Sequence, residues 1–438
     1  MAPLIEVVGV GFVGLSTAVV AARAGYRVVG IEHDPRRLAL LSAGVLPFAE
    51  PGLEAELRTE TGAGRLRFTS PDHRGDSPAI LVVATPTPTL PSGESDPSSV
   101  RAALHRFWDA RRHSLVVIRS TVLPGTIEAL VAGAEFPALA EQVVHWPEFL
   151  NQGRALRELR RPDRVVVGAD SDTAAERFHR LLRTLPIDLS RYERLTLRGA
   201  EAAKHFSNAA LAVNQVLGAE IARLCEDIGV DSGAVLAAVA ADARLDPSLL
   251  RPRAPLVDSC LGKDLAALID NLSLEREPSV LSATVRQADL LRADAVQRLS
   301  RHVKAAGERP RTLIIGAGFA AAVSDTGGSL LWRLLPELEG QDVVVWDPYA
   351  TAPVTDHLGP LLRRDALDGL VREADVVALL VAHPPVAALD WPGLMRSMAR
   401  RGTVLLDYAD FFAQVTGDDA DRVVHRFGNT RCCPACAA

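Results

Sequence analysis

Lysine is scarce in this chain, and aromatic residues make up only 5% of it. Of the 48 basic residues, only Lys204, Lys263 and Lys304 are lysines, so arginine is the ordinary cation here. A lysine kept in such a chain can mark a position that needs a compact ammonium whose pKa shifts readily, or it can arise by chance.

Long apolar runs and an excess of positive charge are also missing. No stretch of about 18 uncharged apolar residues occurs, and no basic segment precedes an apolar one as in a secretion signal. We therefore expect a cytoplasmic protein with no membrane partner. The net charge of −6 and the absence of a basic stripe argue against nucleic acid as a partner. A small molecule is the expected ligand.

The five cysteines do not form a disulfide framework. Cys225 and Cys260 stand alone, whereas Cys432, Cys433 and Cys436 crowd into the tail "RCCPACAA". This tail contains a C-x-x-C pair that could bind zinc, but no second pair or paired histidines lie nearby to complete four ligands. We expect no metal, and an unstructured terminus is the simpler interpretation of the tail.

The first 35 residues have the pattern of a dinucleotide site. An apolar strand, "LIEVVG", leads into a helical stretch and then into a second strand, "YRVVGIEHD". Gly9, Gly11 and Gly14 give G-x-G-x-x-G at the turn, and Glu32 ends the second strand. This spacing is typical of a pyrophosphate at a helix N-terminus with a carboxylate on the ribose. Because a carboxylate repels a 2′-phosphate, the pattern favours NAD over NADP.

Further strands and helices alternate along the chain, which predicts an α/β fold. We expect two Rossmann-like, doubly wound domains joined by a long central helix. Ligands of such sheets bind at the carboxyl ends of strands, where "TPT", "STV" and "PEF" fall here. The expected divisions are an NAD-binding domain at 1–195, a central helical dimerisation and catalytic region at 196–300, and a C-terminal Rossmann-like substrate-binding domain at 305–430.

Cys260 has neighbours that suit a nucleophile. If "SCLGKDLAALIDNL" begins a helix near Ser259, the thiol lies at the helix N-terminus, where the dipole favours thiolate. Asp264 is then one turn later on the same face. Lys204 and Asn208 are also four residues apart, so an ammonium and a carboxamide project side by side from the long helix. A cysteine alone is more often an inert buried residue.

With these motifs the chain resembles the UDP-glucose/GDP-mannose dehydrogenase family over nearly its whole length. The supporting stretches are "GVGFVGLSTA", "GVLPFAEPGLEAEL", "TPTP", "RSTVLPGT", "PEFLNQGRAL", "RPDRVVVG", "AEAAKHFSNA", "CLGKD" and "VVVWDPYA". Enzymes of this family oxidise the primary alcohol of a nucleotide sugar to a carboxylate with two NAD. The resemblance also implies a homodimer.

The resemblance implies a role for each site residue. Cys260 would hold the aldehyde as a thiohemiacetal and then a thioester, and Lys204 and Asn208 would stabilise the oxyanion. Asp264 would orient water, Glu148 would assist hydrolysis, and Thr121 would position water or substrate. The expected cofactor-binding residues are Gly9, Gly11, Phe12, Val13, Gly14, Glu32, Thr85 and Thr121. The expected substrate-binding residues are Glu148, Phe149, Leu150, Lys204, Asn208, Arg244 and Cys260.

Several positions depart from the family pattern. A glycine-rich loop normally precedes the cysteine, but residues 255–259 read "PLVDS", which removes three glycines and adds a negative charge. In "GAGFAAAVSDTGGS", Ala320 and Gly327 replace a lysine and an arginine that bind substrate in the family. Smaller departures are Gln152, where glutamate is usual, and Ala219, where asparagine is usual. The ordinary nucleotide sugar should therefore bind poorly.

The losses fall on substrate-binding positions, while the cofactor glycines and the catalytic residues remain. We therefore expect four-electron oxidation of a primary alcohol to a carboxylate on an altered sugar nucleotide, a nucleotide or a nucleoside intermediate. Specialised metabolism is a natural setting for such a reaction. An ordinary UDP-glucose 6-dehydrogenase, a non-catalytic NAD-binding homologue and a two-electron alcohol dehydrogenase are the alternatives.

Overall fold

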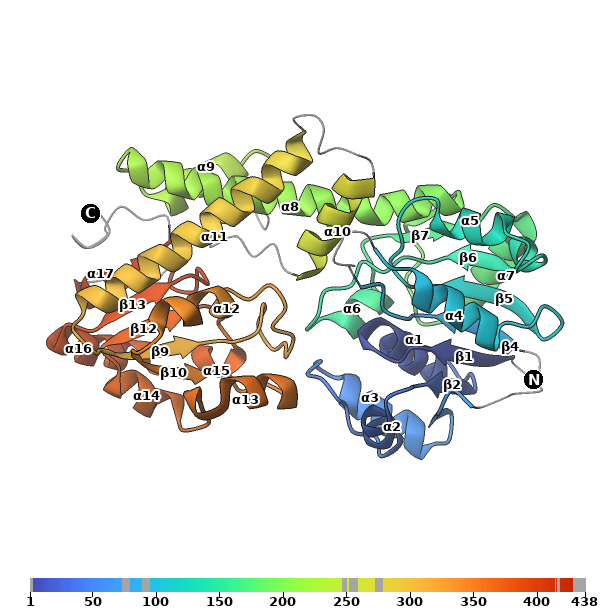
Figure 1. The fold of residues 1–438 in the computed structure, drawn as a ribbon, viewed down its shortest axis with the longest axis horizontal. Helices are drawn as coiled ribbons and strands as arrows, with labels where there is room; N and C mark the ends of the chain where they lie inside the picture. The colour runs from blue at the N-terminus through green and yellow to red at the C-terminus, as the bar shows by residue number, and fades with distance from the viewer. Residues whose placement is uncertain are drawn as a thin grey trace. The chain divides into compact units, whose positions relative to one another are not determined.

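The computed structural model describes residues 3–72, 79–88, 95–245, 250–251, 259–271, 279–413, 415 and 418–427. These residues fall into two compact units, Met1–Asn208 with Ala266–Ser273 and Ala209–Leu265 with Leu274–Ala438. Each unit contains one sheet, and the long helix α8 (Leu197–Asp227) belongs to both (Figure 1). The expected α/β fold with two doubly wound sheets and a long helix between them is confirmed. The division at 195 and 300 into three regions stays a prediction.

The first unit is built on an eight-stranded sheet in the order β3-β2-β1-β4-β5-β6-β7-β8. Its strands are β1 (Leu4–Val8), β2 (Val28–Ile31), β3 (Leu66–Thr69), β4 (Ala79–Val83), β5 (His113–Ile118), β6 (Val143–His145), β7 (Val165–Gly168) and β8 (Tyr192–Leu195). Its helices are α1 (Phe12–Arg23), α2 (Pro35–Ser42), α3 (Leu53–Gly62), α4 (Ser98–Phe107), α5 (Thr126–Ala132), α6 (Ala155–Arg160) and α7 (Asp172–Leu182), with a 3-10 turn at Leu139–Glu141.

Alternate residues of these strands enter two separate cores, one on each face of the sheet. Val7 and Val82 pack with α1, α3, α6 and α7, whereas Val8 and Val83 pack with α4 and α5. Burial on both faces explains why these strands read as continuous apolar runs in the sequence. The strand order reverses between β1 and β4, so the turn after β1 lies at the switch point where ligands of such sheets bind.

One strand pair differs from the expected parallel arrangement. β6 and β7 are antiparallel, with His145 opposite Gly168, whereas every other pair in the first sheet is parallel. An antiparallel neighbour begins at the edge where the previous strand ends, so the chain needs no crossover there. Residues 146–164, which include the "PEF" motif, therefore begin and end at the carboxyl edge of β6.

The second unit contains a six-stranded parallel sheet in the order β11-β10-β9-β12-β13-β14. Its strands are β9 (Arg311–Ile315), β10 (Asp342–Trp346), β11 (Leu362–Arg363), β12 (Val376–Leu379), β13 (Val404–Asp407) and β14 (Val424–Arg426). Its other elements are α9 (Ser232–Ala240), α10 (Ser259–Asn271, which crosses the unit boundary), α11 (Val280–Ala305), α12 (Leu331–Leu334), α13 (Ala352–Leu358), α14 (Leu367–Glu373), α15 (Pro384–Ala387), α16 (Trp391–Arg401) and α17 (Asp418–Val423), with 3-10 turns at Leu335–Leu338 and Gly359–Leu361.

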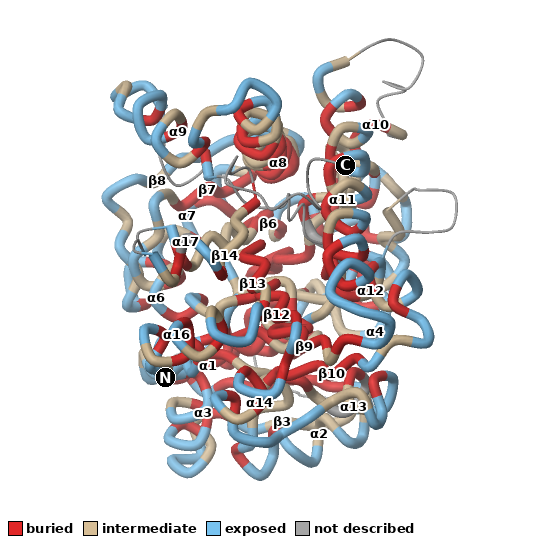
Figure 2. The backbone as a smooth tube through the Cα atoms, turned by 90° about the vertical axis from the view of Figure 1, so that its left-hand side faces the viewer, coloured by how far each residue is buried: buried red, intermediate tan, exposed pale blue. Residues whose placement is uncertain are grey.

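Helices α14 to α17 bury one face of this sheet through a core that contains Trp391, Met398 and Phe412. Near α11, the Tyr408 hydroxyl donates a 3.0 Å hydrogen bond to the Ala295 carbonyl. The central strands of the sheet are buried along their length (Figure 2). Among the described helices, none combines the length and apolar character of a membrane span.

Glu201 fastens the beginning of α8 to the first unit. Its carboxylate is fully buried and accepts hydrogen bonds from the Gly125 N–H at 2.6 Å and the Ile127 N–H at 2.9 Å. Both donors lie at the N-terminal end of α5, whose amide groups have no partner within that helix. Burial raises the pKa of Glu201 to about 7, although the two N–H groups oppose this rise.

This raised pKa predicts a pH dependence of stability. Between the unfolded pKa of 4.5 and the folded pKa of about 7, the folded chain holds a proton that the unfolded chain has lost. The stability contribution is therefore full below pH 4.5 and lost as the pH rises through 7. We expect deprotonation of Glu201 to lower the free energy of unfolding by about 2 kcal/mol between pH 5 and pH 8.

Urea-denaturation midpoints at pH 5 and pH 8 measure this effect. Relative to wild type, Glu201→Gln should show a smaller loss of stability over this interval, even if it is less stable at both pH values. Glu193→Gln is the matched control, because Glu193 is exposed on β8 and should follow wild type. Parallel behaviour of wild type and Glu201→Gln would contradict the prediction.

Candidate active site

The turn between β1 and α1 requires glycine at two of its three glycine positions. Gly9 has a φ of +86°, and a Cβ on it would lie 2.6 Å from the Ala84 carbonyl oxygen. A Cβ on Gly14 would lie 1.9 Å from the carbonyl oxygen of Gly9. A Cβ on Gly11 would meet nothing within 4 Å, so this position faces open space. The three glycines thus bring β1, β4 and α1 close together and leave room beside Gly11.

This turn fits the pyrophosphate of a dinucleotide. Phe12 and Val13 begin α1 directly after Gly11, and no side chain caps the helix N-terminus. The first amide groups of a helix attract an anion through their N–H groups and the helix dipole. NAD accepts a hydride when it is bound at such a site.

Glu32 follows β2, and both of its carboxylate oxygens have partners. Oε1 accepts hydrogen bonds from the backbone N–H groups of His33 and Asp34, and Oε2 accepts one from Arg37 Nε at 3.2 Å. Arg37 also reaches the Val10 carbonyl at 3.3 Å, so it links the acidic residue to the glycine turn. The sequence analysis missed Arg37, although its position two residues into the helix after the acidic residue was a usable signal. The ribose role of Glu32 stays a prediction.

Hydroxyl groups tie together the ends of β4 and β5. Ser120 Oγ donates to the Thr85 carbonyl at 2.7 Å, and Ser99 Oγ donates to Thr85 Oγ1 at 3.1 Å. Thr87 Oγ1 donates to the Thr121 carbonyl at 2.6 Å. The "TPT" and "STV" segments therefore lie together at the carboxyl edge of the sheet, as the sequence predicted.

Lys204 and Glu148 form a mostly buried ion pair in the first unit. Lys204 Nζ lies 3.0 Å from Glu148 Oε1, and the two side chains are 8% and 16% exposed. The same Nζ is 3.5 Å from Asn208 Oδ1, which is a long contact. The other carboxylate oxygen of Glu148 accepts a 2.7 Å hydrogen bond from the Leu150 N–H. The structure thus brings together four of the expected site residues.

The aromatic ring of Phe149 lies between two cations. The guanidinium of Arg164 is 4.2 Å from the ring centroid, and Lys204 Nζ is 5.6 Å from it. Arg164 also donates a 2.9 Å hydrogen bond to the Ser207 hydroxyl on α8. These contacts join the "PEF" segment to the face of α8 that carries Lys204 and Asn208.

Glu50 holds the loop that follows the "PEF" motif through two hydrogen bonds. This carboxylate is 6% exposed and accepts hydrogen bonds from the Gly153 N–H at 2.7 Å and the Ala155 N–H at 2.8 Å. Burial raises the pKa of Glu50 above its usual value, although both hydrogen bonds oppose this. The bonds begin α6 and hold Gly153 in the left-handed conformation at φ +87°. Glu50 is therefore a positioning residue for the loop.

Arg119, which the sequence analysis did not single out, is a buried cation near Glu148. Its guanidinium stacks 3.8 Å from the Trp146 ring centroid and donates to the Trp146 carbonyl at 3.1 Å. Its Nε and Nη2 atoms are buried without a hydrogen-bond partner. Burial lowers the pKa of Arg119 to about 10, and the charge of Glu148 raises it. The positive charge of Arg119 therefore lies near the Glu148 carboxylate. Its place directly before "STV" was the available signal.

His145 stays neutral beside this cation. Its side chain is fully buried and its Nδ1 lies 3.1 Å from the Ile118 carbonyl oxygen. Burial lowers the pKa of His145 to about 3, with a smaller contribution from the charge of Arg119. A neutral histidine adds no second positive charge beside Arg119.

The remaining expected residues belong to the second unit. α10 begins at Ser259 as predicted, so Cys260 lies in the first turn of the helix, but its side chain is outside the described part of the chain. Asp264 is buried, and its Oδ1 lies 3.3 Å from Lys263 Nζ. Arg244 is exposed and pairs with Asp242 at 2.6 Å. The altered segment 255–258 and the cysteine-rich tail also lie outside the described residues.

The second sheet has its own glycine turn, which is closed by an aspartate. Asp347 follows β10 and accepts hydrogen bonds from the Ala317 N–H at 2.7 Å and the Gly318 N–H at 3.1 Å. His383 Nε2 lies 3.1 Å from the same carboxylate oxygen, and its Nδ1 accepts from the Ala322 N–H at 3.2 Å. Burial raises the pKa of Asp347, but His383 and the backbone donors hold it below its usual value. The amides that follow β9 are therefore already satisfied.

Comparison with known proteins decides the family. Residues 3–186 match the model of the UDP-glucose/GDP-mannose dehydrogenase family, NAD binding domain, and residues 198–289 match its central domain. The chain belongs to the UDP-glucose/GDP-mannose dehydrogenase family. It is accordingly an NAD-dependent oxidoreductase of the nucleotide-sugar dehydrogenase type, with its NAD-binding domain in the first unit.

Relatives cover the chain almost from end to end. The UDP-glucose 6-dehydrogenase AglM of Haloferax volcanii is 30% identical, over 88% of this chain and 93% of that protein. The UDP-glucose 6-dehydrogenase of Pseudomonas aeruginosa is 29% identical, over 99% of each chain. A solved structure of a UDP-glucose dehydrogenase from Pyrobaculum islandicum is similar with a TM-score of 0.81 and 28% identity, covering 98% of each chain.

Within this family member, Gly11 and Gly14 offer a matched pair of substitutions. Gly11→Ala adds a methyl group in open space, so we expect the thermal midpoint of wild type. We expect its NAD affinity to fall by about tenfold or more, because the methyl group obstructs the pyrophosphate. Gly14→Ala forces a methyl group against Gly9, so we expect a loss of about 1–3 kcal/mol of stability.

Thermal unfolding and calorimetric NAD titration of both variants separate the two effects. Wild-type NAD affinity in Gly11→Ala would contradict the assignment of the pyrophosphate to this turn. An unchanged midpoint in Gly14→Ala would contradict the close packing of α1 against β1.

Proposed function

We propose that the protein oxidises a primary alcohol of an altered sugar nucleotide, a nucleotide or a nucleoside intermediate to a carboxylate in two steps, each with NAD as acceptor. The observation that carries this proposal is the buried Lys204–Glu148 pair beside Asn208, in a family member that also has Cys260 in the first turn of α10. These residues can support acyl chemistry on a sulfur nucleophile, which a two-electron alcohol dehydrogenase does not need.

The proposed reaction consists of two oxidations and a hydrolysis, and NAD accepts the hydride in each oxidation. The first oxidation removes a hydride and a proton from the alcohol and leaves an aldehyde. The Cys260 sulfur adds to the aldehyde carbon to give a thiohemiacetal, and a second loss of hydride and proton gives a thioester. Water then adds to the thioester, the carbon–sulfur bond breaks, and the carboxylate leaves with the thiol regenerated.

Lys204 and Asn208 supply donors for the oxygen that becomes negative in these steps. A buried ammonium and a carboxamide N–H stabilise an oxyanion far more than water does. Glu148 accepts the proton of the attacking water, and the positive charge of Arg119 lies near that carboxylate. Thr121 and Asp264 position the water, and Phe149, Leu150 and Arg244 contribute to substrate binding in the same proposal.

The identity of the substrate is inferred from two replaced cations in the second unit. Ala320 and Gly327 stand where the family has a lysine and an arginine, and both positions are partly exposed in the second unit. Loss of two charge-assisted contacts weakens binding of a diphosphate sugar by roughly tenfold to a hundredfold each. The replaced residues at 255–259 support the same conclusion. We therefore place an altered sugar nucleotide, a nucleotide or a nucleoside intermediate ahead of UDP-glucose.

UDP-glucose itself is the second candidate, because the relatives at 29–30% identity are named UDP-glucose 6-dehydrogenases. An NAD-binding protein without turnover is a third candidate. The second candidate differs from the main proposal in the substrate that is oxidised, and the third differs in that the bound NAD is never reduced.

A substrate panel with product masses tests these candidates. We expect NADH formation and a carboxylate product, at two NADH per product, with nucleoside monophosphates, nucleosides or altered sugar nucleotides rather than with UDP-glucose. Cys260→Ala should make no carboxylate, and Lys204→Met should lower kcat by about a hundredfold. One NADH per product would point to a simple alcohol dehydrogenase.

Two further outcomes separate the alternatives. Efficient turnover of UDP-glucose by wild type would favour the ordinary substrate. If the lost cations explain poor binding of UDP-glucose, Ala320→Lys with Gly327→Arg should raise kcat/KM for it by about tenfold or more. Absence of turnover across the panel, with NAD binding intact, would favour the non-catalytic alternative.

We also propose that the chain forms a homodimer through α8. Leu217 and Leu224 on α8 and Ile228 directly after it are 44%, 54% and 73% exposed and recur at intervals of seven and four residues. An exposed apolar stripe of this kind marks a protein interface. Light scattering should give a dimer for wild type and a monomer for Leu224→Glu, and a monomeric wild type would contradict the proposal.

A further inference from the structure

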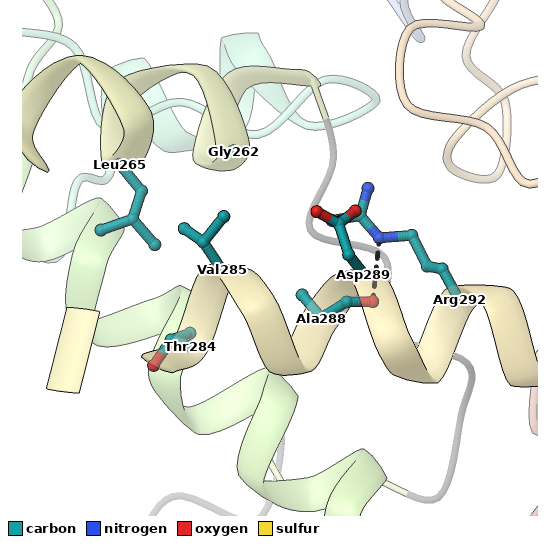
Figure 3. Close-up of a pocket in the computed structure, with 7 residues that line it drawn as sticks. All are labelled: Gly262, Leu265, Thr284, Val285, Ala288, Asp289 and Arg292. Carbon is teal, nitrogen blue, oxygen red and sulfur yellow. Dashed lines mark hydrogen bonds and ion pairs between the residues drawn. The ribbon is translucent and has the colours of Figure 1, made fainter. Parts of the chain in front are cut away.

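A cavity in the second unit lies between α10 and α11. Its volume is about 210 Å³, and it is lined by Gly262, Leu265, Thr284, Val285, Ala288, Asp289 and Arg292. Leu265 and Val285 point toward each other from the two helices at one end, and Asp289 and Arg292 lie together at the other end (Figure 3). The cavity therefore has an apolar wall and a charged edge.

The charged edge carries an excess of positive charge. Asp289 Oδ1 lies 3.0 Å from Arg333 Nη2 but 3.8 Å from Arg292 Nη2. Two guanidinium groups thus share one carboxylate, and Arg333 has the closer contact. The carboxylate of Asp289 is half exposed, which weakens its hold on either arginine.

Arg292 is the less satisfied of the two arginines. Its side chain is 15% exposed, and its hydrogen bond is from Nε to the Ala288 carbonyl at 3.3 Å within α11. Burial lowers the pKa of Arg292 below its usual value, with Asp289 raising it and Arg333 lowering it further. A guanidinium has five N–H donors, and a mostly buried one is costly unless an anion accepts them.

The elements around the cavity connect it to the proposed reaction. Gly262 lies two residues after Cys260 on α10, so the helix of the proposed nucleophile forms one wall. Arg333 lies on α12, and the neighbouring Trp332 indole donates a 3.0 Å hydrogen bond to the Thr326 carbonyl. Thr326 precedes Gly327, where the family has an arginine. Asp289 and α12 thus link Arg292 to the segment that has lost a substrate-binding cation.

We propose that this cavity is a binding subsite for a phosphate group, held by Arg292 with the less polar part of the same ligand against Leu265 and Val285. Arginine binds phosphate through two parallel N–H···O bonds, which its partly unused fork can form here. The source of the phosphate is either the substrate itself or a separate small phosphate. The first source rests on the proposed function, whereas the subsite does not.

Inorganic phosphate is the probe for the subsite. We expect it to raise the thermal midpoint of the NAD-saturated protein in a saturable way, measured against chloride at equal ionic strength. Saturation with NAD keeps the pyrophosphate turn from contributing. Arg292→Gln should weaken the apparent phosphate affinity by about tenfold or more. Arg286→Gln, which removes an exposed arginine from the same helix, is the matched control and should behave as wild type.

A variant that fails to fold cannot decide the question, so Arg292→Lys is included. It keeps the charge but not the planar fork, and we expect phosphate affinity between those of wild type and Arg292→Gln. Wild-type phosphate affinity in either well-folded Arg292 variant, or absence of a saturable phosphate effect on wild type, would overturn the subsite.

Kinetics then distinguishes the two sources. If the substrate supplies the phosphate, Arg292→Gln should raise KM for the phosphorylated substrate by about tenfold and leave KM for its dephosphorylated counterpart unchanged. If KM is unchanged for both while phosphate binding is lost, a separate phosphate occupies the subsite. Should no substrate be turned over, the phosphate titration still decides the subsite, so its failure and that of the proposed function remain distinct.

Discussion

Two hydrogen bonds to the Glu201 carboxylate set the position of the residues proposed to act on the substrate. They attach α8 to the beginning of α5, and Lys204 and Asn208 follow about one and two turns later on the same helix. Lys204, three residues after Glu201, meets Glu148 at 3.0 Å from this fixed start of the helix. The opposite partner is fixed just as locally, since Glu50 bonds the loop that follows Glu148. Two buried carboxylates thus hold in place a third, Glu148, which is proposed to take part in the reaction.

The sequence predicted the parts of this arrangement that depend on local pattern. Glycine spacing, apolar strands and helical periodicity gave both sheets, the 31-residue helix α8 and the start of α10 at Ser259. It did not predict the antiparallel β6–β7 pair, because the direction of a strand depends on its three-dimensional connection and leaves no mark in a short apolar run. The roles of Cys260, Asp264 and Arg244 remain predictions.

Buried cations were the features hardest to see from the sequence. One arginine among so many forms no sequence pattern of its own. The fold shows that Arg119 stacks on Trp146 and that two of its nitrogen atoms have no hydrogen-bond partner. Arg292 is similar, since its significance comes from Arg333 competing for the same carboxylate. Buried charge with incomplete pairing lowers stability, so such residues direct attention to function. Both of these cations are arginines, which fits a chain that uses lysine so rarely.

Asp347, which closes the turn after β9, limits where the enzyme can bind NAD. In each sheet an acidic residue follows the second strand. Glu32 accepts hydrogen bonds from the two amides that directly follow it. Asp347 instead accepts them from the Ala317 and Gly318 amides of the glycine turn, which a pyrophosphate would need. The second turn therefore cannot serve as a reserve dinucleotide site. A single turn must serve both oxidations of the proposed reaction, so each chain has to exchange its cofactor midway. In the proposed reaction, the bond to Cys260 would keep the half-oxidised substrate attached to the enzyme during this exchange.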